Sequence, residues 1–146
     1  MLLAIHRHVF VLVAIACGIF LEGCQGGATP VRVHPVSGTL SVNGQPVSNI
    51  IVHFVPGNGR PSTGVTDAGG KFDLQYEKGI RGVVPGEHKV WIEYKPGSPA
   101  EEMAMREGKL SLPTDVAAAL KKYGALETSS YTVTVDGPKA DLKLDL

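Results

Sequence analysis

The chain has 146 residues, and its 14 basic and 14 acidic side chains give a formal net charge of zero. This length fits a single domain of about 100 to 200 residues, and a balanced charge without a basic stripe argues against a nucleic-acid-binding protein. Glycine and proline are abundant, at 18 and 10 residues, against 4 phenylalanines and 1 tryptophan. Such a composition is typical of short strands joined by many turns.

An export signal is predicted over residues 1–23. A weakly basic start at residues 6–8 precedes the run from Val9 to Leu21, which carries no charged side chain. The run is shorter than the about 20 apolar residues of a transmembrane helix. Its length suits the apolar core of a secretory signal peptide.

The signal ends in Leu21-Glu22-Gly23-Cys24, which resembles the lipobox of bacterial lipoproteins, although Glu22 departs from the small or β-branched residue usual there. The resemblance implies that the Cys24 thiol carries a diacylglycerol, with palmitate a typical acyl chain. Two or more acyl chains make membrane anchoring stable. Two alternatives remain, a rival box at Ala14-Ile15-Ala16-Cys17 and an ordinary signal peptide with an incidental cysteine.

Beyond the cysteine, residues 24–35 are predicted to be a flexible tether because they are rich in glycine, threonine and proline. Residues 36–146 are expected to form one domain. They contain no cysteine, so the domain must be stable without disulfides.

The domain is predicted to contain seven antiparallel strands. Val36–Val42 alternates with period two, and Asn43-Gly44 after it is a strong hairpin signal. The returning strand, Val47–Val55, is apolar on both faces and is expected to be central. Further strands are predicted where alternation resumes between Gly-rich or Pro-Gly turns, at 63–66, 71–76, 87–94, 131–135 and 142–146. This spacing predicts an all-β, two-sheet sandwich.

A short helical insert is predicted before the last two strands. Ser98-Pro99-Ala100-Glu101 is a capping box with proline at the first helical position, and Gly108 is placed to end that helix. A second helix is expected over Thr114–Tyr123, with Val116, Leu120 and Tyr123 on one stripe. We expect the insert to lie over one sheet and to cover Trp91.

Several strings of residues from Val36 to Lys95 resemble the carboxypeptidase regulatory-like, or transthyretin-like, domain of small bacterial lipoproteins. They are Val36-Ser37-Gly38-Thr39-Leu40, Asn43-Gly44-Gln45-Pro46-Val47, Val52-His53-Phe54-Val55-Pro56, Gly64-Val65-Thr66-Asp67-Ala68-Gly69-Gly70-Lys71-Phe72 and Val84-Pro85-Gly86-Glu87-His88-Lys89-Val90. The resemblance implies a seven-stranded, prealbumin-like Greek key, exported and surface-anchored, generally without assigned enzymatic activity. These motifs are turn signatures, so they specify fold better than function.

No catalytic group, metal site or cofactor is predicted. Only His53 and His88 lie on expected strands, and two histidines without cysteine or spaced carboxylates are a weak zinc signal. Asp67 precedes alanine and two glycines, which suits a turn better than a calcium site. Trp91 lies on the polar face of its strand, where an exposed indole could contact a ligand.

These observations predict a non-enzymatic lipoprotein, exported and anchored in the membrane at the bacterial cell envelope. Its domain would be an interaction or structural module for an envelope protein or a glycan, with no nucleic acid involved. One alternative is a carbohydrate-binding module that uses Trp91. A second is an envelope hydrolase, which requires His53 and His88 to converge on a carboxylate or hydroxyl.

Overall fold

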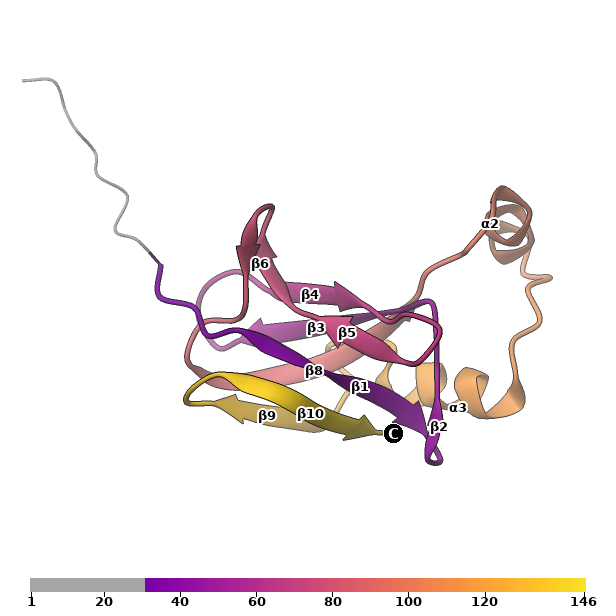
Figure 1. Ribbon diagram of the computed structural model, residues 1–146. Coiled ribbons are helices and arrows are strands. Elements are labelled where there is room, and N and C mark those ends of the chain that lie inside the picture. Colours follow the sequence, from indigo (N-terminus) through magenta and orange to yellow (C-terminus); the bar gives the residue numbers. More distant parts are fainter. Residues whose placement is uncertain (1–30) are drawn as a thin grey trace, which may run out of the picture. The chain divides into compact units, whose positions relative to one another are not determined.

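Two β-sheets enclose a common apolar core in the computed structural model, which describes residues 31–146 (Figure 1). The predicted export signal, most of the tether, Cys17 and Cys24 lie outside the described residues. Strands are the main regular structure of the described part and form two sheets, as in a β-sandwich; two short helices are also present.

The small sheet has four strands. These strands are β1 (Val36–Val42), β2 (Gln45–Pro46), β5 (Lys71–Asp73) and β10 (Lys139–Asp145). Strand β1 is central, with β10 on one side and both β2 and β5 paired to it. The small sheet therefore joins the two ends of the domain sequence.

The large sheet has six strands in the order β7-β6-β4-β3-β8-β9. Strand β3 lies between β4 and β8, so the prediction that this doubly apolar strand is central is confirmed. The bounds are β3 (Ile50–Pro56), β4 (Ser62–Val65), β6 (Gln75–Glu77), β7 (Ile80–Arg81), β8 (Gly86–Tyr94) and β9 (Tyr131–Val135).

Three details of strand pairing differ from the sequence prediction. The described residues form ten strands rather than seven, because short segments at 45–46 and 80–81 pair and the chain from 71 to 77 is divided between the sheets. The sheets are not wholly antiparallel, since β1 and β10 run parallel. The Asn43-Gly44 turn leads into β2, whereas β3 belongs to the other sheet.

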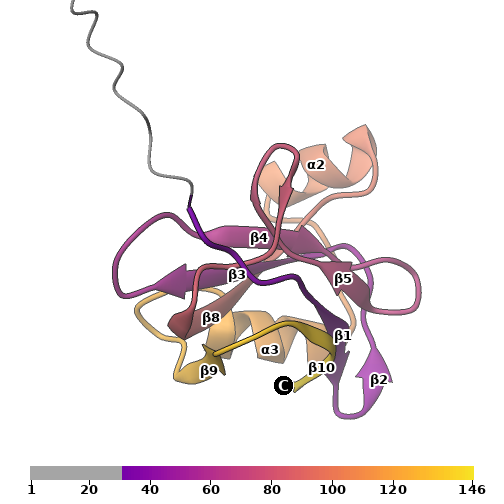
Figure 2. The same cartoon turned by 60° about the vertical axis from the view of Figure 1, so that its left-hand side comes forward.

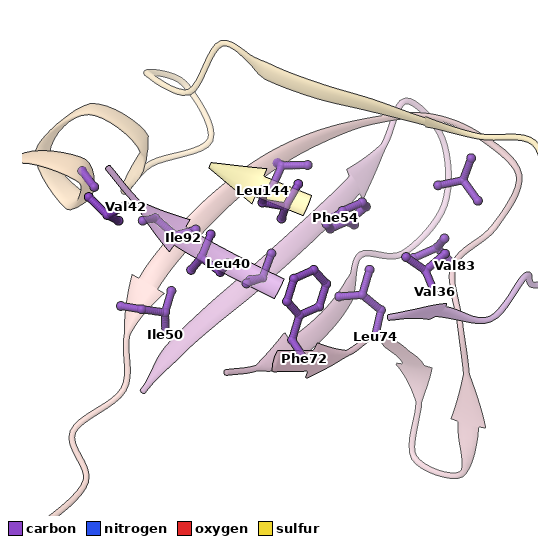
Figure 3. Packing of buried hydrophobic residues seen from close by; sticks show 14 of the residues in the cluster. Val36, Leu40, Val42, Ile50, Phe54, Phe72, Leu74, Val83, Ile92 and Leu144 are labelled. Carbon is purple, nitrogen blue, oxygen red and sulfur yellow. The ribbon is translucent and has the colours of Figure 1, made fainter. Parts of the chain in front are cut away.

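The predicted alternation of side chains is confirmed. In β1, Val36, Leu40 and Val42 are buried, and in β3 the buried residues are Ile50, Val52 and Phe54. Figure 3 shows Leu40 and Val42 of β1 near Ile92 of β8, and Val36 beside Val83; all of these residues belong to one core cluster with Leu144. The inner faces of the two sheets thus make one core.

The turns use the residues expected of them. Asn43 and Gly44 both have positive φ, 52° and 77°, as a type I′ turn requires. The Asp67 carboxylate accepts hydrogen bonds from the backbone N–H groups of Gly69 (2.8 Å) and Lys71 (2.9 Å), and Gly70 has a φ of 71°. Asp67 is therefore a turn residue, as predicted.

The two helices, α2 (Pro99–Arg106) and α3 (Thr114–Tyr123), differ in how they pack. The N-terminus of α2 is capped by the Ser98 hydroxyl, which accepts from Glu101 N–H at 3.2 Å, yet this helix buries no side chain. Figure 1 shows α2 at the end of an extended connection, and the Tyr94 hydroxyl at the end of β8 donates to the Glu101 carboxylate of α2 at 3.0 Å. Helix α3 buries Val116 and Ala119 in the core and lies close to β8 (Figure 2).

The expectation that the helical stripe covers Trp91 is wrong. Val116 and Ala119 belong to the same core cluster as Ile92. Because neighbouring residues of a strand point to opposite faces, Trp91 lies on the face of β8 that points away from α3. The stripe of α3 therefore closes the core on the inner side.

Candidate functional site

The outer face of the large sheet, which points away from the core, brings together side chains from four strands. The strand register aligns Gln75 of β6 with Thr63 of β4, Thr63 with His53 of β3, and His53 with Trp91 of β8. Adjacent strands lie about 4.8 Å apart, so these four residues form one cross-strand row of roughly 14 Å. Polar side chains occupy one half of this row and aromatic rings the other.

His53 and Trp91 form a face-to-face aromatic pair. Their ring centroids are 3.8 Å apart and the ring planes differ by 6°. Stacking of this kind contributes about 0.5 to 1.5 kcal/mol beyond the area that it buries. One face of the indole is consequently covered by the imidazole, and Trp91 is half-buried rather than fully exposed.

Glu93, two residues after Trp91 on the same face, completes the group. Its carboxylate lies 3.3 Å from His53 Nε2, with side-chain exposures of 15% for His53 and 47% for Glu93. Burial lowers the pKa of His53 below its ordinary value of 6.5, and the neighbouring charge of Glu93 opposes this shift. The imidazole is therefore held mainly neutral at neutral pH.

This arrangement predicts a pH-dependent fluorescence of Trp91, the only tryptophan of the chain. Because an imidazolium stacked on an indole quenches its emission, we expect the fluorescence to fall on acidification, with a midpoint below pH 6.5. The stability contributed by neutral His53 is present above pH 6.5 and is lost as the pH falls through that value toward the folded-state pKa. A fluorescence titration measures the midpoint.

Two variants control this titration. His53→Gln should abolish the transition. Glu93→Gln should move the midpoint further down, because it removes the charge that raises the pKa of His53. A wild-type midpoint at or above pH 6.5 would contradict the dominance of burial.

A polar hollow lies where β4 and β6 of the large sheet meet β1, β5 and β10 of the small sheet. It has a volume of about 750 Å³ and includes Thr63, the cross-strand neighbour of His53. Polar and charged side chains line most of it, from Ser37, Thr39, Thr63, Asp67, Lys71, Asp73, Gln75 and Asp141. Thr63 and Gln75 therefore connect this hollow to the outer-face row, whereas the two rings do not line it.

His88 does not belong to this site. It is fully buried in the core, its Nε2 lies 2.8 Å from the carbonyl oxygen of Val84, and its ring packs 5.8 Å from that of Phe54. His53 and His88 lie on opposite faces of the large sheet. The convergence that the hydrolase alternative requires is therefore absent from residues 31–146.

The sequence did not predict which outer-face side chains are neighbours, because this depends on the pairing register of the strands. Alternation placed Trp91 and Glu93 on one face of their strand and His53 on one face of another, but it could not pair the two strands. Thr63 and Gln75 carried no signal at all. Cys24, the predicted lipid-bearing residue, lies outside the described residues, so the structure does not place it.

Residues 31–146 lack two further features. There, no group of three or more histidine, cysteine, aspartate or glutamate side chains could hold a metal ion. No helix in that range is long and apolar enough to cross a membrane. No family model, curated protein or solved structure matches the chain. The transthyretin-like resemblance accordingly remains a prediction from sequence.

Proposed function

We propose that this chain is a non-enzymatic lipoprotein of the bacterial cell envelope, held in a membrane through acyl chains on Cys24. Its domain is a Greek-key sandwich of the carboxypeptidase regulatory-like, or transthyretin-like, type, with a helical insert before the last two strands. The domain works as an interaction module for another envelope component.

The observation that supports this proposal best is the stacked pair of His53 and Trp91 on the outer face. Tryptophan is enriched among the residues that dominate binding energies at protein interfaces, especially where neighbouring groups hold it rigid. The stack fixes the indole before any partner arrives, so less conformational entropy is lost on binding. Glu93 and Lys89, on the same face, add charges of both signs around it.

A photo-crosslinking experiment in intact cells tests the outer face. A photoreactive residue replaces Thr63, which is exposed beside His53, and the matched control carries it at Lys121, exposed on α3. We expect a discrete adduct from position 63 and none from position 121. Trp91→Ala should reduce the adduct strongly, since loss of an anchoring aromatic costs about 2 kcal/mol or more. Equal adducts from both positions would contradict the proposal.

A carbohydrate-binding module is the second candidate, favoured by the 750 Å³ polar hollow, which includes Thr63, the cross-strand neighbour of His53. Hydroxyls, an amide and carboxylates can bond sugar hydroxyls, and aromatic carbon can pack on a sugar ring. Only one face of the Trp91 indole is open to such packing, because His53 covers the other. The same crosslinks separate the two candidates, since a glycan adduct is lost on glycosidase treatment, whereas a protein adduct persists and yields peptides of a second protein in mass spectrometry.

A further inference from the structure

Two Asn-Gly pairs occur in the described chain, and the fold treats them differently. Asn43-Gly44 forms the turn between β1 and β2, and Asn58-Gly59 lies in the connection between β3 and β4. All four residues are exposed. When glycine follows asparagine, the glycine backbone nitrogen reaches the carbonyl carbon of the asparagine side chain with least steric hindrance, because glycine has no Cβ. Attack of this nitrogen on that carbon is the first step of asparagine deamidation.

At the first pair, the Gly44 backbone nitrogen, which would attack the Asn43 side chain in deamidation, is held by a hydrogen-bond acceptor. Gly44 N–H donates to Asp145 Oδ1 at 3.0 Å, and the Ser41 hydroxyl donates to the same oxygen at 2.7 Å. These bonds lower the pKa of Asp145, so the acceptor is a carboxylate. A carboxylate opposes removal of the Gly44 amide proton, and the hydrogen bond must break before the nitrogen can turn toward Asn43.

At the second pair, the backbone nitrogen has no such partner. Residues 57–60 make no backbone hydrogen bond outside the strand ladders in the described chain. The space around Gly57 is open, and the nearest atom to the Cβ position of Gly59 is Pro56 Cγ at 3.8 Å. The nearest ion pair joins Arg60 to Glu77 at 3.4 Å and leaves Asn58 free.

We propose that Asn58 is a site of spontaneous deamidation and that the fold protects Asn43 from the same reaction. The Gly59 nitrogen attacks Asn58 Cγ, a carbon–nitrogen bond forms, and the side-chain nitrogen leaves as ammonia with the amide proton. Water then opens the cyclic imide at either carbonyl. The products are aspartate at position 58 or its β-linked isomer, and each adds one negative charge.

This charge arises at the border of the outer face. Asn58 lines a hollow of about 740 Å³ together with Val55 and Lys89 of the outer face and the carboxylates of Glu87 and Glu127. A third carboxylate there is repelled by the negative charges of the two already present and competes with them for the positive charge of Lys89. The β-linked isomer also lengthens the β3–β4 connection by one backbone carbon. Deamidation therefore changes the charge and shape of the outer face as the protein ages.

Mass spectrometry of the full-length lipoprotein, aged at mildly alkaline pH, tests the proposal. The readouts are the mass increase from amide to acid at each asparagine and enzymatic methylation of the β-linked isomer. Asn43 is the internal control. We expect Asn58 to convert roughly tenfold or more faster than Asn43. This is the factor in rate that one charge-assisted hydrogen bond provides when it must break first. Asn58→Gln should remove the fast conversion.

Two comparisons isolate the cause. In denaturant the two sites should convert at nearly equal rates, because the Asp145 contact is lost. Asp145→Ala should accelerate conversion at Asn43 in the folded protein and leave Asn58 unchanged. Equal rates at both sites in the folded wild type, or a rate ratio that persists in denaturant, would overturn the proposal.

Discussion

Replacing Cys24 with serine is expected to abolish fatty-acid labelling and to release the protein from the membrane fraction. The hydroxyl of serine is not the thiol that the lipid-transferring machinery alkylates, so no acyl chain is attached. Each buried methylene of an acyl chain contributes about 0.8 kcal/mol, and losing two chains removes essentially all membrane affinity. Metabolic labelling with a fatty acid and membrane fractionation measure the two effects.

Cys17→Ser is the matched control for this experiment. If the lipobox ends at Cys24, Cys17→Ser keeps the label. Persistent labelling of Cys24→Ser together with loss of label in Cys17→Ser would move the anchor to the rival box. Labelling that survives in both single variants but not in the double variant would show that either cysteine can be used.

Replacing Phe54 with alanine is expected to lower the free energy of unfolding by about 3 to 5 kcal/mol. Phe54 is fully buried on central strand β3 and packs against the ring of His88. Domains of this size have total stabilities of about 5 to 15 kcal/mol, so the variant loses a large share. Denaturant unfolding followed by Trp91 fluorescence gives the midpoint.

Val65→Ala is the control on the same sheet. Val65 lies on β4 and is 43% exposed, so truncating it should change the stability by less than about 0.5 kcal/mol. If Val65→Ala destabilised the protein as strongly as Phe54→Ala, the outer face at β4 would be covered, and its use as a binding surface would be contradicted.

Local features were predictable because local chemistry decides them. Asn43-Gly44 turns because both residues tolerate positive φ, Asp67 caps its own turn, and Ser98 caps α2. Alternation over β1 and β8 placed the right side chains in the core, since burial of one face repeats every second residue, whereas β3 is apolar on both faces and its pattern did not choose the inner one. None of these features depends on which strands are neighbours.

The candidate site depended on pairing, and pairing is not a local property. Several strands share the same alternating pattern, so their apolar faces are interchangeable and the pattern cannot choose among neighbours. Only the assembled sheet sets His53 beside Trp91 and Thr63. The aromatic pair and its carboxylate follow from that register, whereas the polar hollow also depends on β1, β5 and β10 of the small sheet.

Close approach between backbones was also invisible in the sequence. Gly38 occupies an inward position of β1, where a Cβ atom would meet the carbonyl oxygen of Leu142 on β10. Gly64 likewise lies against the backbone of Asp73, where the chain crosses from one sheet to the other. Alternation and turn chemistry thus decided the strands and their faces. The parallel β1–β10 pair, the position of α3 and the outer-face row were decided only when distant segments packed around one core, because they rest on contacts between residues far apart in the chain.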